Sequence, residues 1–155
     1  MIRFSWLLLL LSVGFCSGSL AAEAENAKEL VAKLYAAQNA NESPLAHPGD
    51  KEKLGVFFDS TLSGLIVKDQ KEAGEEVGRL DFDPIYDAQD TEIQDFKIAP
   101  PKVNDDATEV VVTFKNMGEP QQIVFVLRET ESGTRISDIR YADGRTLKKI
   151  LQADL

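Results

Sequence analysis

The apolar positions in the first half of the chain recur at intervals of three and four residues, the spacing of one face of an α-helix. The first set comprises Ala27, Leu30, Val31, Leu34 and Tyr35. Asn26 and Glu29 have the spacing of a capping box, which predicts that this helix begins at Asn26. The second set comprises Leu54, Phe57, Phe58, Leu62 and Leu65. Asp50 is a favourable N-cap, so we expect one further helix after it, with Gly64 in its interior.

The second half of the chain alternates between apolar and polar residues, as half-buried strands do. The expected strands span residues 91–98, 108–115, 123–127 and 135–141. Residues 123–127 are continuously apolar, which predicts that both faces of this strand are covered. In the last strand, Ile136 and Ile139 depart from strict alternation, which indicates a β-bulge.

The order of these elements predicts the fold class. Leu147, Ile150 and Leu151 indicate a short helix that closes the chain. Helices that precede an antiparallel meander are typical of α+β proteins. We therefore expect N-terminal helices packed on a curved antiparallel sheet of about four strands, followed by a short C-terminal helix.

Residues 1–24 have the pattern of a secretory signal peptide. Arg3 precedes an apolar run from Phe4 to Phe15, and small residues follow it. Ser19-Leu20-Ala21 and Ala22-Glu23-Ala24 both suit signal peptidase, and we favour cleavage after Ala24. An uncleaved anchor is the alternative, but the run is short for a span. The expected product is one α+β domain over residues 25–155, periplasmic or secreted, with no stable membrane insertion after cleavage.

Charge and composition exclude several kinds of chemistry. The net charge of −9 disfavours nucleic acid and anionic lipid surfaces as partners. The single cysteine, Cys16, lies in the predicted signal peptide, so the domain has no disulfide and no thiol chemistry. The single histidine, His47, lies in a loop rich in proline and glycine, and zinc sites need several His or Cys ligands. We expect no cofactor.

One segment and two flanking motifs resemble a known family. The segment is Leu80-Asp81-Phe82-Asp83-Pro84-Ile85-Tyr86-Asp87-Ala88-Gln89-Asp90. Phe57-Phe58 precedes it, and Ile136-Ser137-Asp138-Ile139-Arg140-Tyr141 and Gly144-Arg145-Thr146-Leu147 follow it. Together they resemble the exported bacterial family known as domain of unknown function 3828, over nearly all of residues 25–155. The resemblance implies an NTF2-like α+β cone, whose helices fold against a curved sheet and often leave a pocket. It implies no established activity.

The same segment has two physical interpretations. Four carboxylates have the spacing of positions one, three, seven and twelve of a calcium loop: Asp81, Asp83, Asp87 and Glu92. Position six of such a loop requires glycine and is Tyr86 here, so this metal site is a weak candidate. We favour a structural role in which Asp83 caps a helix and Pro84 occupies its first position.

Three functions remain open. The first is a non-enzymatic module that binds a small apolar molecule or an envelope protein through the open end of the cone. Its candidate residues either line a pocket or fill the core: Tyr35, Phe57, Phe58, Phe82, Tyr86, Phe125 and Tyr141. The second is an acid–base pocket enzyme, in which Asp59 or Asp138 faces a cavity together with a tyrosine. The third is an envelope interaction or immunity-like protein, in which the face of strand 123–127 pairs in a homodimer unless a helix covers it.

Overall fold

Helices and strands are segregated along the chain, which confirms the predicted α+β class. The computed structural model describes residues 17–46, 49–74, 76–104 and 106–154. The helical elements are α1 (Ser17–Asn39), the 3-10 turn η1 (Pro44–Ala46), α2 (Lys51–Phe57), α3 (Ser60–Ala73) and α4 (Leu147–Gln152). The strands are β1 (Ile93–Ile98), β2 (Lys102–Val103), β3 (Thr108–Asn116), β4 (Glu119–Thr130) and β5 (Gly133–Tyr141).

The first helix is longer than its sequence pattern predicts. Helix α1 begins at Ser17, so Asn26 lies in its interior and the predicted capping box is wrong. The added turns contain Ala21, Ala22 and Ala24, and alanine has the highest helix propensity. The apolar run of the predicted signal peptide lies within residues 1–16, which, like His47, are outside the described residues.

The second predicted helix is divided into α2 and α3. Asp50 caps α2 as predicted, accepting hydrogen bonds from two backbone N–H groups at 3.1 Å each. The division comes at Phe58, whose extended backbone forms a parallel bridge with Ile136 of β5. Asp59 then caps α3, because its Oδ1 accepts a hydrogen bond from the Leu62 N–H at 2.7 Å. Gly64 lies inside α3 and causes no break.

The strands form one antiparallel sheet in the order β1-β3-β4-β5, with β2 paired to β3. Met117 and Gly118 both have positive φ and form the two-residue turn between β3 and β4, a geometry that favours glycine. The predicted β-bulge is confirmed, because Ser137 is the extra residue between the pairs Leu127–Ile136 and Val126–Asp138. Strand β2 was not predicted, since two residues are too few to show alternation.

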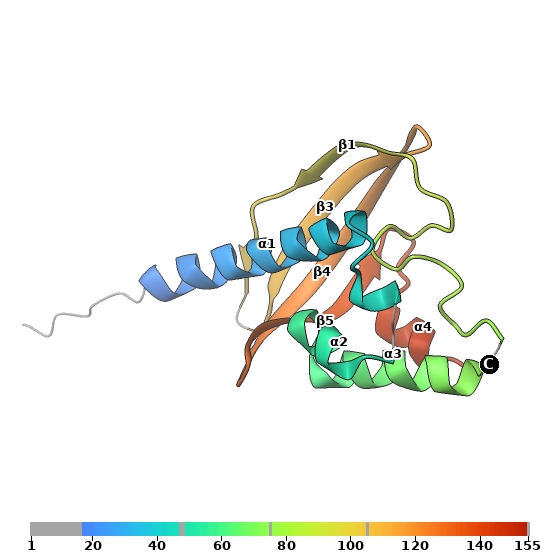
Figure 1. Cartoon of the computed structure of the whole chain (residues 1–155). Coiled ribbons are helices and arrows are strands. Elements are labelled where there is room, and N and C mark those ends of the chain that lie inside the picture. The colour runs from blue at the N-terminus through green and yellow to red at the C-terminus, as the bar shows by residue number, and fades with distance from the viewer. Residues whose placement is uncertain (1–16, 47–48, 75, 105, 155) are drawn as a thin grey trace, which may run out of the picture.

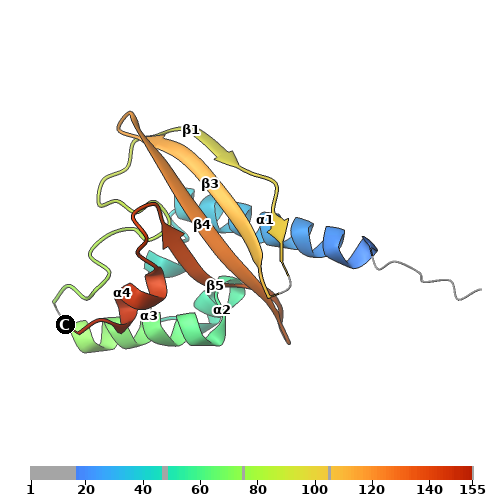
Figure 2. The same ribbon diagram turned by 180° about the vertical axis from the view of Figure 1, so that it is seen from behind.

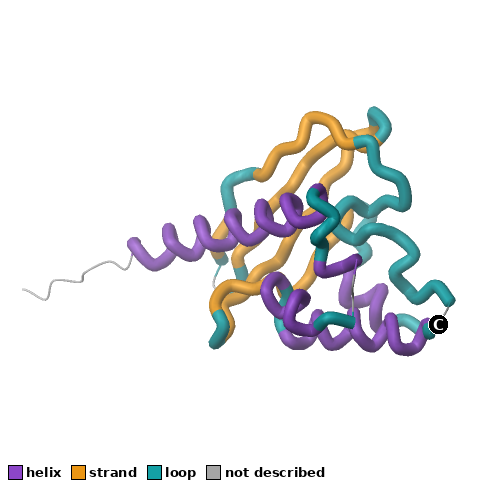
Figure 3. Tube along the Cα trace, in the orientation of Figure 1, coloured by secondary structure: helices purple, strands orange, loops and turns teal. Residues whose placement is uncertain are grey.

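The described helices pack against one face of the sheet, which we call the inner face (Figures 1 and 2). Helix α1 crosses it, and α2, α3 and α4 lie along the β5 side (Figure 3). On β4, Ile123, Phe125 and Leu127 point inward and are at most 1% exposed. Their neighbours Val124 and Val126 point to the opposite, outer face and are partly exposed. The expectation that both faces of this strand are covered is therefore wrong for the described part of the chain, where the outer face is partly exposed.

Candidate functional site

Three tyrosine hydroxyls fasten the segment 80–90 to the rest of the fold. The Tyr35 hydroxyl donates to the carbonyl of Ile85 at 2.7 Å, and the Tyr141 hydroxyl donates to the carbonyl of Pro84 at 3.1 Å. The Tyr86 hydroxyl donates to Asn39 Oδ1 at 3.1 Å. Burial raises the pKa of both Tyr35 and Tyr141 above its ordinary value, so both hydroxyls keep their protons. These groups hold structure in place through neutral hydrogen bonds.

The aromatic rings around Tyr35 fill the space between α1 and the sheet. The Tyr35 ring lies edge-on to Tyr86, Phe96 and Phe125, with centroid distances of 5.3, 4.7 and 5.8 Å. Of the seven predicted pocket residues, five are at most 5% exposed: Tyr35, Phe58, Tyr86, Phe125 and Tyr141. The other two, Phe57 and Phe82, are partly buried and pack against the same core. The interpretation that these residues fill the core is the one that their burial supports.

Asp83 organises the segment 80–90 locally. Its Oδ1 accepts a hydrogen bond from the Ile85 N–H at 2.9 Å, and its Oδ2 accepts one from Gln38 Nε2 at 2.6 Å. This is an Asx turn, and Pro84 begins a turn, so the predicted helix cap is wrong. Burial raises the pKa of the Asp83 carboxyl, although hydrogen bonds from the backbone of Ile85 and Tyr86 lower it. Gln38 Oε1 is buried without a hydrogen-bond partner among the described residues.

Asp87 forms the outer end of this segment. Both of its carboxylate oxygens accept hydrogen bonds from Arg145 at 2.9 Å. The Arg145 guanidinium also lies over the rings of Phe82 and Tyr141, at 5.7 and 5.2 Å from their centroids. Burial raises the pKa of Asp87, while the hydrogen bond from Arg145 lowers it. The ion pair between Asp87 and Arg145 is partly exposed, and its guanidinium packs against two aromatic rings at this end of the segment.

Of the four carboxylates that were weak candidates for a calcium site, two bind other side chains and two are exposed to solvent. Asp83 and Asp87 bind Gln38 and Arg145 respectively, while Asp81 and Glu92 are exposed. Within residues 17–154, apart from the few positions left undescribed, no three His, Cys, Asp or Glu side chains group closely enough to hold a metal ion. The sequence spacing therefore does not bring the four carboxylates together in the described part of the chain.

The two carboxylates proposed for acid–base chemistry accept hydrogen bonds from backbone N–H groups in the first turns of helices. Asp59 caps α3, and its Oδ2 lies 4.0 Å from the Nζ of Lys148. Asp138 Oδ1 accepts hydrogen bonds from the N–H groups of Ile139 and Lys148, at 2.9 and 3.0 Å. The three tyrosine hydroxyls donate to other acceptors. The described residues therefore form no Asp–Tyr pair of the kind that the enzyme hypothesis requires.

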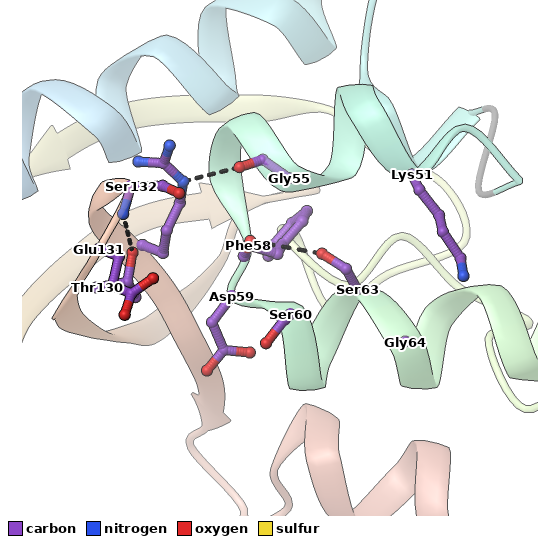
Figure 4. A pocket seen from close by; sticks show the side chains of 11 residues that line it. Lys51, Gly55, Phe58, Asp59, Ser60, Ser63, Gly64, Thr130, Glu131 and Ser132 are labelled. Carbon is purple, nitrogen blue, oxygen red and sulfur yellow. Dashed lines mark hydrogen bonds between the residues drawn. The ribbon is translucent and has the colours of Figure 1, made fainter.

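A cavity opens between α2, the start of α3 and the turn after β4, and two residues that the sequence offered as site candidates, Phe58 and Asp59, are among those that line it (Figure 4). Its volume is about 590 Å³, and its polar lining includes Lys51, Asp59, Ser60, Glu131 and Arg135. Arg135 Nε donates to the carbonyl of Gly55 at 2.7 Å, which ties the β4–β5 turn to α2. The lining mixes both signs of charge and comes from segments about 70 residues apart, so no local motif identifies it.

The outer face of the sheet carries an apolar centre. Val111 and Val124 are direct cross-strand partners on β3 and β4, and Val126 follows on the same face. All three are partly exposed. Five exposed cations share this face by register and alternation: Lys97, Lys102, Lys115, Arg128 and Arg140. The continuous apolar run at 123–127 was the only sequence signal of this surface.

No protein-family model, no curated protein and no solved structure matches this chain. The resemblance to domain of unknown function 3828, with its NTF2-like cone, stays a prediction. None of the described helices is long and apolar enough to cross a membrane. The function of this chain is therefore inferred below from the geometry of its surfaces and side chains.

Proposed function

We propose that this chain is an exported, non-catalytic module that binds a protein partner through the outer face of its sheet. One observation carries the proposal. Val111, Val124 and Val126 form a partly exposed apolar centre on β3 and β4, on the face that the described helices leave open (Figure 2). Neighbouring apolar side chains on the surface of a soluble protein are a common feature of protein interaction sites. Export is supported by the signal-peptide pattern of residues 1–24.

A protein suits this surface better than a small molecule does. Small-molecule sites are concave and keep apolar side chains available to the ligand. Here the aromatic side chains that were candidates for such a lining mostly pack against one another, and the hydroxyls of Tyr35 and Tyr141 bind backbone carbonyls. A sheet face is broad, and its apolar centre with a charged rim has the layout of a protein interface.

Site-specific photo-crosslinking in the exporting cell tests this proposal. A photo-reactive phenylalanine analogue replaces Val124, and a matched variant carries it at Ala32, an exposed position on α1. We expect a discrete adduct with a second, different polypeptide from position 124 and none from position 32. Failure of position 124 to give an adduct, in a variant that is exported and folded, would contradict the proposal.

A further inference from the structure

We infer that the partner presents an acidic surface to the outer face of the sheet, an inference that rests on the function proposed above. The face carries five cations, Lys97, Lys102, Lys115, Arg128 and Arg140, and three carboxylates, Asp95, Glu109 and Asp138. The whole chain has a net charge of −9. The outer face is therefore a basic surface on an acidic protein.

Among the described residues, two of these cations are paired with a carboxylate and three are not. Lys115 Nζ lies 2.7 Å from Asp95 Oδ2, and Arg140 is paired with Glu109. Lys97, Lys102 and Arg128 take part in no ion pair among the described residues, and all three are exposed. Lys97 lies on β1, Lys102 on β2 and Arg128 on β4, around the three valines. Carboxylates on a docked partner can pair with them at the edge of the apolar centre.

The position of the charges selects an acidic partner over a second copy of this chain. A two-fold symmetric dimer through this face would place the same cationic patch of each protomer opposite the other. Like charges brought together in this way oppose association. An acidic partner is attracted to this face and is repelled by the negative excess that the rest of the chain carries. The charge distribution thus orients the partner as well as attracting it.

The test compares two triple variants of equal charge change. Lys97→Glu/Lys102→Glu/Arg128→Glu alters the outer face, while Lys28→Glu/Lys71→Glu/Lys149→Glu alters exposed lysines on α1, α3 and α4. The probe is a synthetic peptide rich in glutamate and leucine, titrated into the isotope-labelled chain. We expect amide shifts on β3, β4 and β5, and affinity about tenfold weaker in the sheet variant but changed less than about twofold in the helix variant.

Equal weakening in both variants, or shifts confined to the helices, would overturn the inference. The unfolding midpoint of each variant, measured alongside, shows that both remain folded. The same sheet variant carrying the photo-reactive residue at position 124 separates the two proposals. If the adduct with the partner is equally strong in this variant, the inference of an acidic partner is wrong and the proposed function still holds. If the adduct is with a second copy of the chain, the inference of an acidic partner is also wrong. If the chain with its native lysines and arginine gives no adduct at position 124, the proposed function is wrong.

Discussion

At the scale of single residues, three tyrosines show that the interior of this protein has a structural role. Each places its ring in or against the core and its hydroxyl on a protein acceptor: the carbonyls of Ile85 and Pro84, and the amide oxygen of Asn39. A buried hydroxyl that is hydrogen-bonded stabilises the fold, and one that is left unpaired destabilises it. The hydroxyl groups of the three tyrosines thus hold the segment 80–90 in place.

Removing one of the buried hydroxyls tests this role. Tyr35→Phe and Tyr141→Phe each leave a buried carbonyl of Ile85 or Pro84 without its donor, so we expect each to lower the free energy of unfolding by about 1–2 kcal/mol. Urea denaturation measures the change. Tyr86→Phe is the control and should cost less, because its hydroxyl meets a partly exposed side chain. Unchanged stability in the first two variants would contradict the anchoring role.

The Asp83 carboxyl gives a prediction about pH. Its pKa is raised by burial in the folded state, so the folded protein holds this proton more tightly than the unfolded chain does. The stability that it contributes is full below the unfolded pKa, about 4, and is lost as the pH rises through the folded pKa. Asp83→Asn removes this loss while its side-chain oxygen can still accept from the Ile85 N–H.

We therefore expect Asp83→Asn to gain stability relative to the parent chain as the pH rises from about 4 to about 7. Chemical denaturation at several pH values measures the difference in the free energy of unfolding. Asp81→Asn, a change at an exposed carboxylate in the same segment, is the control. A difference between Asp83→Asn and the parent that stays constant with pH would show that burial does not raise this pKa.

At the scale of elements, the sequence predicted those whose signal is local. The strands β1, β3 and β5, the bulge in β5, the cap at Asp50 and the helix α4 all follow from alternation, turn residues or caps. The sequence did not predict the boundaries that depend on contacts between residues far apart in the chain. The break between α2 and α3 depends on the bridge between Phe58 and Ile136, and residues so far apart in sequence leave no periodic trace.

Asp69 connects helix α3 to residues 79–80 and, through Arg79, to the end of α4. No local sequence pattern predicts these contacts. The Asp69 carboxylate accepts hydrogen bonds from the N–H groups of Arg79 and Leu80 and from the Arg79 guanidinium, at 2.9, 3.2 and 3.0 Å. Arg79 Nε in turn donates to the carbonyl of Ala153, near the end of α4. Gly78 allows this approach, since a Cβ there would lie 2.6 Å from Asp69 Oδ2.

We expect Asp69→Ala to lower the free energy of unfolding by about 2 kcal/mol, because it leaves the backbone N–H groups of Arg79 and Leu80 without their acceptor, while the Arg79 guanidinium keeps Glu72 as its partner. Asp69→Asn should cost less, since one acceptor oxygen remains. Thermal and urea denaturation measure both. A loss below about 1 kcal/mol in Asp69→Ala would show that this buried carboxylate does not join α3 to the C-terminal helix.

The contacts of helix α1 predict where the chain would begin after the proposed export and cleavage. Leu20, Ala21 and Ala22 are exposed, whereas Glu23 Oε1 accepts a hydrogen bond at 2.7 Å from the hydroxyl of Thr108, which is 1% exposed. Cleavage after Ala24, which the sequence alone favours, would remove this partner of a buried hydroxyl. Cleavage after Ala21 would keep it. If the chain is cleaved as proposed, we expect the product to begin at Ala22, as intact mass and N-terminal sequencing measure, and a start at Glu25 would contradict this.

At the scale of the whole molecule, the sheet separates two environments. The inner face carries the aromatic core, and the outer face carries valines within a basic rim. The sequence indicated the apolar run of β4 but not the basic rim, because the five cations lie on five strands and only the pairing register places them on one surface. The candidate docking face is a property of the assembled sheet.

Native mass spectrometry of the chain purified from the cell that produces it tests whether this protein binds a protein and not a small molecule. We predict a complex of the chain with a second, different polypeptide, which dissociates as the ionic strength rises because exposed charges hold it. The chain released from that complex should carry no further mass. A small molecule bound in fixed stoichiometry, with no polypeptide partner, would contradict the account.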